Sequence, residues 1–196
     1  MKGHSAHPGT SEIIAEAVSA AVETCGIHPG VFSLVQGGNR EVGTALVQHP
    51  LINAVGFTGS LAGGRALFDL CAQREHPIPF FGELGSVNPM FLLPGAVTNR
   101  GNQIGAGWAG SLTLGAGQFC TNPGVAFLMD GPEASAFIEA AIKALKQVEP
   151  QTMLTDGIAE AYRGGRDRVS NAAGVEEVLA SICEHRDAGP VLLKTS

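Results

Sequence analysis

Two patterns of hydrophobic and polar residues alternate along the first half of the chain. Residues 10–26, TSEIIAEAVSAAVETCG, space their apolar side chains by three and four positions, which predicts a helix with Ile14, Val18, Ala21 and Cys25 on its buried face. Apolar runs bounded by Gly or Pro predict strands, and they fall at 31–35, 54–58, 78–84 and 89–94. Residues 39–49 and 59–74 predict helices, the second with inward Leu61, Leu67, Leu70 and Cys71.

The second half of the chain shows a different texture. Residues 99–120 are rich in small side chains and predict a partly helical segment, and 124–129 predict a strand. Residues 133–148 form a clear amphipathic pattern, with inward Phe137, Ile138, Ala141, Ile142, Leu145 and Val148. A polar helix at 158–169 and a strand at 190–196 complete the pattern.

Strands and helices in alternation, with short connections, predict an α/β fold with a parallel sheet covered on both faces. The change of texture places a boundary near residue 85, between a nucleotide-binding type of α/β domain at 1–85 and a second α/β segment at 86–196. The chain opens on a basic loop and closes on a strand, so both edges of such a sheet would be unpaired. We therefore expect an internal portion of a longer protein.

The amino-acid composition excludes some classes of binding partner for this chain. The 196 residues are 44% hydrophobic and 15% charged with a net charge of −6, which predicts a folded chain and argues against nucleic acid or an anionic membrane as partner. No apolar run reaches the length of a membrane span, and the first residues lack the pattern of a signal peptide. Four cysteines without a CxxC pair indicate free thiols, no metal site and a cytoplasmic location.

Cys120 is the first candidate for chemistry, within GAGQFCTNPG at residues 115–124. A glycine-rich approach leaves steric room for a substrate and exposes backbone amides that can bind the oxyanion formed after attack on a carbonyl. Free cysteines are more often buried and inert, and spacing alone favours that alternative for Cys120. Cys25, Cys71 and Cys183 lie in helical or apolar surroundings and are predicted to be inert filler.

Three further segments offer polar groups. Glu83 stands at the carboxyl end of an apolar strand, where open α/β sheets bind ligands, so it is either a general base or an exposed turn residue. Ser60 joins a strand to a helix in FTGS and can cap the helix or touch a phosphate, with capping favoured on this segment alone. Lys2 is a cation near the first helix, and His4 and His7 lack a third ligand for a metal.

Four segments together resemble the aldehyde dehydrogenase superfamily. They are KGHSAHPGTSE, GFTGS, GELGSVNP and GAGQFCTNPG, in the family's order, and the resemblance covers nearly the whole chain. It is nearest to the branch with α-ketoglutarate semialdehyde (2,5-dioxovalerate) dehydrogenases and some NADP-linked fatty-aldehyde enzymes. The resemblance implies an incomplete Rossmann-type cofactor domain at 1–85 and part of the α/β catalytic domain at 86–196.

The resemblance also implies a role for each matched residue. Cys120 falls on the nucleophile and Glu83 on the general base that activates the thiol or the hydrolytic water. Lys2 and Ser60 fall on residues that hold the ribose and pyrophosphate of NADP or NAD, and the backbone of Leu84 and Gly85 falls near the nicotinamide. No metal is implied. The partners implied are a small aldehyde and further copies of the full-length chain.

Two features of the family's pattern are missing from these residues. The asparagine that completes the oxyanion hole precedes the matched segments, and the glutamate that holds the nicotinamide ribose follows them. We therefore expect little or no turnover from these 196 residues alone. The alternatives are a catalytically incomplete fragment and a nucleotide-binding module that uses FTGS and Lys2 with an idle Cys120.

Overall fold

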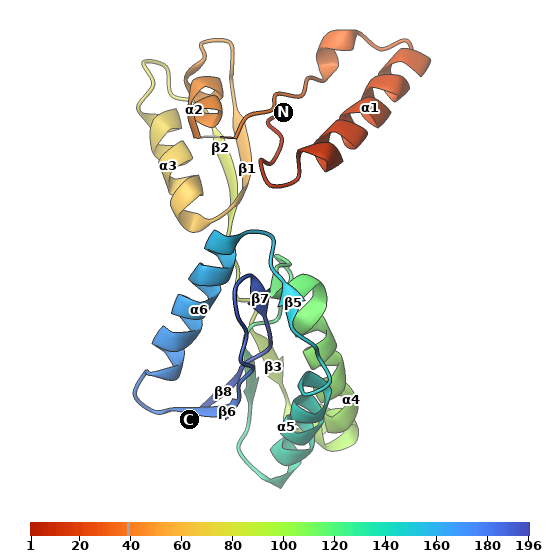
Figure 1. The fold of residues 1–196 in the computed structure, drawn as a ribbon, viewed down its shortest axis with the longest axis vertical. Helices are drawn as coiled ribbons and strands as arrows, with labels where there is room; N and C mark the ends of the chain where they lie inside the picture. Colours follow the sequence, from red (N-terminus) through yellow and green to blue (C-terminus); the bar gives the residue numbers. More distant parts are fainter. Residues whose placement is uncertain (39) are drawn as a thin grey trace. The chain divides into compact units, whose positions relative to one another are not determined.

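The computed structural model describes residues 1–38 and 40–196, which form two compact units, Met1–Gly85 and Ser86–Ser196. Both units contain a pair of parallel strands, and their other elements differ (Figure 1). Asn39, the first residue of the helix predicted at 39–49, lies outside the described residues.

The centre of the Met1–Gly85 unit is a strand–helix–strand motif. β1 (Val55–Gly59) and β2 (Phe80–Leu84) pair in parallel, and α3 (Leu61–Ala72) connects them. α2 (Arg40–Gln48) contacts α3, and Arg74 donates hydrogen bonds of 2.8 and 2.9 Å to the carbonyl oxygens of Val47 and Ile52. The predictions of these two strands and two helices are confirmed, as is the burial of Cys71.

The N-terminal segment departs from the sequence analysis. α1 (Pro8–Thr24) is a helix as predicted, but it has no buried residue and lies apart from β1 and β2 (Figure 1). Its half-buried positions are Ser11, Ala15, Val18 and Val22. The predicted buried face is therefore wrong except at Val18, because the main neighbour of α1 in the described chain is the adjacent turn η1 (Pro29–Val31).

The strand predicted at 31–35 is also wrong. The Gly30 amide at the start of η1 donates to the ring of His28, so this part of the chain is a capped turn. After the turn, only Val35 of residues 31–35 takes part in strand pairing, through a single parallel bridge with Lys2. In α3, the predicted inward Leu61 is 61% exposed, because it is the first residue of the helix.

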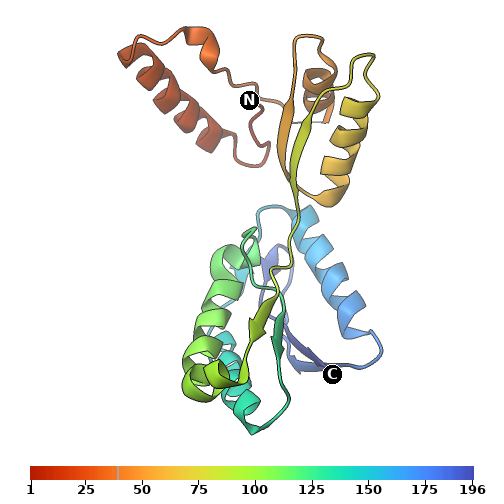
Figure 2. The same cartoon turned by 180° about the vertical axis from the view of Figure 1, so that it is seen from behind.

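The core of the Ser86–Ser196 unit lies between two helices and two parallel strands. α4 (Pro94–Thr113) and α5 (Pro132–Leu145) pack along each other, next to β3 (Met90–Leu92) and β4 (Ala126–Leu128) (Figure 2). Seven buried side chains form one cluster: Leu92, Val97, Trp108, Ala109, Phe137, Ala141 and Leu145. The predicted inward face of the helix at 133–148 is confirmed, since each of its six residues is buried or half-buried.

The remaining strands of this unit are antiparallel, which the sequence analysis did not predict. β5 (Gln151–Thr152) pairs with β7 (Asp187–Ala188), and β6 (Val175–Leu179) pairs with β8 (Leu192–Thr195). α6 (Asp156–Ser170) contacts β6 and β7. The α/β class holds, but in the described part of the chain the expected parallel sheet is present only as two separate two-stranded pairs.

Each of the two parallel strand pairs has one face that is exposed to solvent. Phe81 on β2 is 67% exposed and Phe91 on β3 is 69% exposed, while Leu92, next to Phe91, is buried in the core. Phe91 and Phe127 stack with ring centroids 4.9 Å apart on the uncovered face of β3 and β4. The expectation of a sheet covered on both faces is therefore wrong for the residues described.

Candidate active site

Cys120 is exposed, on the loop that joins α4 to β4. Two hydrogen bonds attach the part of this loop that follows Cys120 to α4. Trp108, buried in α4, donates from Nε1 to the carbonyl oxygen of Pro123 over 2.9 Å. The residue before Pro123, Asn122, donates from its side chain to the carbonyl oxygen of Leu112, the next-to-last residue of α4. A solvent-accessible thiol is thus carried on a loop that is bound to α4, and Trp108 itself belongs to the core.

The backbone before Cys120 is in a rare conformation. η2 (Leu114–Gly117) contains three consecutive residues in the left-handed region, with φ of 59° at Gly115, 57° at Ala116 and 72° at Gly117. Ala116 carries a Cβ, so the surrounding structure must hold it in this conformation. The abundant glycine of GAGQFC is therefore explained by a left-handed turn rather than by steric room alone.

The carbonyl oxygen of Cys120 is held by two side chains from the segment that precedes β3. Ser86 Oγ donates to it, and Asn88 Nδ2 donates to it over 2.7 Å and to the carbonyl oxygen of Asn122 over 2.9 Å. Asn88 itself has a φ of 47°, which asparagine tolerates better than most residues. Sequence reasoning did not assign Ser86 or Asn88 to the site, although both belong to the quoted segment GELGSVNP.

Within the described part of the chain, the hydrogen bonds from Ser86 and Asn88 leave backbone amides free on both sides of the Cys120 side chain. With the carbonyl oxygen of Cys120 bound, the N–H groups of Cys120 and Thr121 find no hydrogen-bond acceptor among residues 1–38 and 40–196. Fixed, unpaired amides next to a nucleophile can stabilise the negative charge of a tetrahedral intermediate. The geometry at Cys120 therefore suits attack on a carbonyl.

The other sequence-predicted residues lie in the Met1–Gly85 unit. Four of them meet at the carboxyl end of one strand pair, where Thr58 is opposite Glu83 and Gly59 is opposite Leu84. Ser60 follows β1 and caps α3, with its Oγ accepting from the Gly63 amide over 3.1 Å. Gly85 follows β2 with a φ of 79°, in the left-handed region that favours glycine.

Glu83 and Leu84 are neighbours on β2 but differ in burial. Glu83, the last residue but one of β2, is exposed. Leu84 is half-buried against α3, where a Cβ on Gly64 would lie 1.9 Å from Leu84 Cδ2. Gly64 thus allows the helix to approach the strand end that carries Leu84 and Gly85.

Lys2 lies on a different segment of the same unit. It bridges Val35, and its Nζ donates to the carbonyl oxygen of Gly3 over 2.9 Å. The rings of His4 and His7 stack 4.6 Å apart. Partial burial, with smaller contributions from His7 and Lys2, lowers the pKa of His4. Across residues 1–38 and 40–196, no three His, Cys, Asp or Glu side chains gather closely enough to hold a metal ion.

Two units thus carry the candidate residues, with Cys120 in one and Lys2, Ser60, Glu83, Leu84 and Gly85 in the other. Their catalytic and cofactor-binding roles stay predictions. In the described part of the chain, no helix has both the length and the apolar character needed to cross a bilayer.

Solved structures define the class of fold. The glyceraldehyde-3-phosphate dehydrogenase GapN of Methanocaldococcus jannaschii matches all of this chain over 43% of its own length, with a TM-score of 0.81 and 22% identity. A benzaldehyde dehydrogenase of Corynebacterium glutamicum matches 89% of this chain over 39% of its own, with a TM-score of 0.71 and 22% identity. The fold is therefore that of part of an aldehyde dehydrogenase, as expected.

The sequence defines the family. Residues 1–161 match the aldehyde dehydrogenase family, and the chain belongs to it. An α-ketoglutaric semialdehyde dehydrogenase of Azospirillum brasilense is 47% identical over 187 residues, which are 95% of this chain and 36% of that protein. Another from Acinetobacter baylyi is 42% identical over 174 residues, 89% of this chain and 33% of that protein. The chain spans about a third of the length of these curated relatives.

Proposed function

We propose that this chain carries the nucleophile and part of the cofactor site of an NAD(P)-dependent aldehyde dehydrogenase. The observation that carries the proposal is the exposed Cys120 thiol on a backbone fixed by Ser86 and Asn88, in a chain that belongs to this family. The substrate class that we favour is a semialdehyde such as α-ketoglutarate semialdehyde. Identity of 42–47% to relatives of that name supports this choice over a fatty aldehyde.

Cys120 is the nucleophile in this proposal. Its thiolate attacks the aldehyde carbon and forms a tetrahedral thiohemiacetal, whose oxygen faces the free N–H groups of Cys120 and Thr121. Loss of hydride converts this adduct into a thioester on Cys120. Water then hydrolyses the thioester to the carboxylic acid and restores the thiol, so that aldehyde, water and oxidised cofactor give acid, reduced cofactor and one proton.

Glu83 is the general base in this proposal. An exposed carboxylate can take a proton from water or from the thiol and return it to solvent. Its position at the carboxyl end of β2 supports this role, because ligands of open α/β sheets bind at that end of the strands.

The strand ends of the Met1–Gly85 unit fit a dinucleotide cofactor, NADP or NAD. The N–H groups of Leu61 and Ala62, at the start of α3, have no acceptor among the described residues, and a helix start of this kind binds phosphate groups. Ser60 would share the pyrophosphate, Lys2 would hold the ribose or its phosphate, and the backbone of Leu84 and Gly85 would lie along the nicotinamide. The cofactor supplies the hydride acceptor when bound.

The remaining expectations are part of the same proposal. All four cysteines are free, in keeping with a reducing cytoplasm. The partners are a small aldehyde and, for the complete enzyme, further copies of the chain, with no nucleic acid or membrane.

Alkylation with iodoacetamide at neutral pH tests the nucleophile, with each cysteine followed by peptide mass spectrometry. We expect Cys120 to react at least several-fold faster than Cys25, which is also exposed and therefore serves as the internal reference. Equal rates at Cys120 and Cys25 would contradict the activated thiol and leave the nucleotide-binding alternative.

Turnover with α-ketoglutarate semialdehyde and NADP or NAD separates the complete enzyme from the incomplete one. Formation of reduced cofactor that is lost in Cys120→Ser and kept in Cys25→Ser supports a complete site. Fast labelling of Cys120 without turnover supports the alternative in which these residues hold the nucleophile but only part of the site. Turnover that survives Cys120→Ser would refute the assignment.

A further inference from the structure

The left-handed turn that precedes Cys120 depends on contacts from outside itself. Ala116 adopts a φ of 57°, a left-handed conformation that is strained for a residue with a Cβ. Its amide is satisfied by a distant side chain, because Gln151 Oε1 accepts from the Ala116 N–H over 2.7 Å. The contact joins the turn to β5, which is 35 residues away along the chain.

A second contact joins the same two segments. Gln118, two residues before Cys120, donates from Nε2 to the carbonyl oxygen of Gly115 over 3.0 Å and accepts from the Leu154 amide over 3.0 Å. Gln118 thus closes the turn with one end of its amide and binds the 151–154 segment with the other. The Gln151 and Gln118 side chains are therefore two parallel links between the turn and residues 151–154.

Packing between these segments is incomplete, so the two links matter more. A cavity of about 190 Å³ lies between them, lined by Leu112, Ala116 and Gly117 on one side and by Gln151 and Met153 on the other. This cavity is open to solvent, so the apolar side chains that line it are not fully packed against each other. The position of the turn therefore depends on the hydrogen bonds of Gln151 and Gln118.

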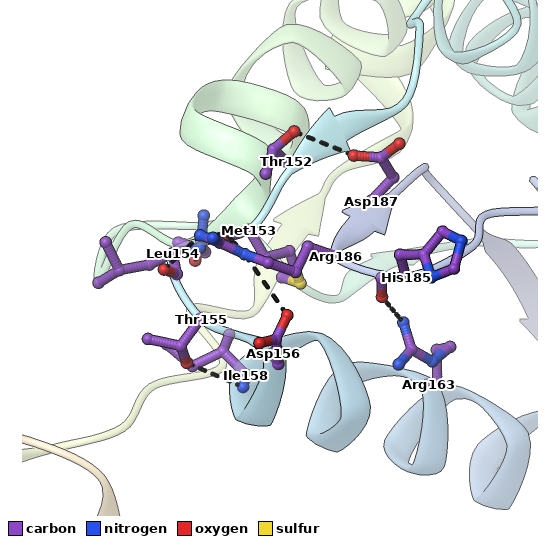
Figure 3. A network of polar contacts seen from close by, with 11 residues as sticks. Thr152, Met153, Leu154, Thr155, Asp156, Ile158, Arg163, His185, Arg186 and Asp187 are labelled. Atoms are coloured by element: carbon purple, nitrogen blue, oxygen red, sulfur yellow. Dashed lines mark hydrogen bonds and ion pairs between the residues drawn. The ribbon is translucent and has the colours of Figure 1, made fainter. Parts of the chain in front are cut away.

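Arg186 in turn fixes the 151–154 segment (Figure 3). Its guanidinium donates from Nη2 to the carbonyl oxygens of Met153, over 2.7 Å, and Leu154, over 2.6 Å. Nε donates to Met153 as well, and the Met153 amide donates back to the carbonyl oxygen of Arg186 over 2.9 Å. Asp156 lies 3.7 Å from Nε, in an exposed ion pair.

We propose that Gln151 and Arg186 are positioning residues for the Cys120 thiol. Arg186 fixes residues 153 and 154, and Gln151 and Gln118 transmit that position to the turn from which Cys120 projects. The proposal rests on the function proposed above, since it explains how that nucleophile is held. Arg186 lies beyond residues 1–161, the part of the chain that matches the family, so the match assigns it nothing.

The test compares the alkylation rate of Cys120 with that of Cys25 in three variants. Gln151→Leu removes the acceptor for Ala116, and Arg186→Met removes the donors to Met153 and Leu154. We expect each to lower the ratio of the Cys120 rate to the Cys25 rate about three- to tenfold, the factor that corresponds to one lost hydrogen bond. Arg186→Lys keeps a donor and should recover part of the ratio.

Arg163→Met is the matched control. Arg163 donates from Nη1 to the carbonyl oxygen of His185, next to Arg186, but it contacts neither Met153 nor Leu154 (Figure 3). Its removal should leave the ratio unchanged even where it lowers thermal stability. Trp108 fluorescence checks that each variant is folded, since Trp108 binds Pro123 beyond the cysteine.

The outcomes separate the two proposals. A high ratio in the unchanged chain that stays high in Gln151→Leu and Arg186→Met overturns the positioning role and leaves the nucleophile intact. A ratio near one in the unchanged chain overturns both. An equal loss in Arg163→Met and Arg186→Met, parallel to a loss of stability, also overturns the positioning role, because a general structural effect then accounts for it.

Discussion

The two parallel strand pairs of this molecule carry the candidate residues in different ways. In Met1–Gly85 the only buried hydrophobic side chains among the described residues are Val47 and Cys71. In Ser86–Ser196 a cluster of seven buried side chains lies under β3 and β4, and the loop that carries Cys120 is attached to it through Trp108.

The difference teaches how each site is held. The proposed phosphate-binding residues depend on local features, namely the cap of Ser60 on α3 and the pairing of β1 with β2. The proposed nucleophile depends on residues far away in the sequence, such as Ser86, Asn88 and Gln151. We therefore expect the nucleophile loop to be the more stable of the two, and the following substitutions test that expectation.

Leu145→Ala should have the largest effect on stability. Leu145 is 1% exposed within the core cluster, and a buried Leu→Ala substitution costs about 2–5 kcal/mol. Urea unfolding followed by the fluorescence of Trp108, the one tryptophan of the chain, measures this cost in Ser86–Ser196. Leu67→Ala, at a half-buried position of α3, should cost about 1–2 kcal/mol by circular dichroism. Equal costs would remove the contrast between the units.

Gly105→Ala should come next. A Cβ there would lie 2.3 Å from the carbonyl oxygen of Phe137, so α4 and α5 would have to separate, at a cost of about 1–3 kcal/mol. Gly107 on the same helix has nothing within 4 Å of that position, and Gly107→Ala should stabilise the chain by about 0.5–1 kcal/mol.

Gly64→Ala provides the comparison in the other unit. The new Cβ would meet the Leu84 side chain, which can rotate, whereas the obstacle at Gly105 is backbone. Gly64→Ala should therefore cost less than Gly105→Ala when the urea unfolding of both variants is followed by circular dichroism. A larger cost at Gly64 would show that the contact of α3 with β2 is as rigid as the contact between α4 and α5.

The sequence predicted elements whose packing is regular and local. The helix at 133–148 and the strands at 54–58 and 78–84 were predicted because periodicity reports burial when an element packs on one face. The same reasoning failed for α1, whose apolar residues include Ile13 and Ile14, exposed at 67% and 52%. Periodicity there indicated a helix but not which face would be covered.

Strands with charged or very short sequences escaped prediction. β6 has the sequence VEEVL, where two glutamates interrupt the apolar pattern, and β5 and β7 have two residues each. The strand expected at 31–35 has apolar residues but only Lys2 as a partner in the described chain. Pairing partners, rather than composition, decided these cases.

The candidate site was predicted through order of motifs rather than through spacing. Spacing alone favoured an inert Cys120, and the resemblance assigned it the nucleophile's role. Ser86 and Asn88 were not found, because they act on a carbonyl oxygen more than thirty positions away. Gln151 and Arg186 were not found for the same reason, since hydrogen bonds to backbone leave no periodic signal in a sequence.

Removing one hydroxyl cap from a helix in each unit compares the stabilities of the two units through the same kind of substitution. Ser60 Oγ accepts from the Gly63 amide over 3.1 Å, and Thr155 Oγ1 accepts from the Ile158 amide over 3.2 Å. Ser60→Ala and Thr155→Ala should each cost about 1 kcal/mol. Hydrogen exchange should rise along α3 in the first variant and only near the start of α6 in the second. Faster exchange along the whole of α6 would contradict the greater stability of Ser86–Ser196.

Lowering the pH through the titration of His4, in Met1–Gly85, should have the smallest effect. Partial burial, then His7 and Lys2, lowers the pKa of His4, so the unfolded chain, with a His pKa of about 6.5, binds this proton more tightly than the folded one. The contribution of His4 to the stability of Met1–Gly85 is therefore complete above pH 6.5 and is lost as the pH falls below that value.

Hydrogen exchange at Gly3, whose amide donates to Val35 over 2.9 Å, should become faster at pH 5 than its intrinsic rate predicts. His4→Asn keeps an acceptor for the Ala6 amide but does not titrate, so it should abolish this dependence. The same pH dependence in His4→Asn would assign it to another group.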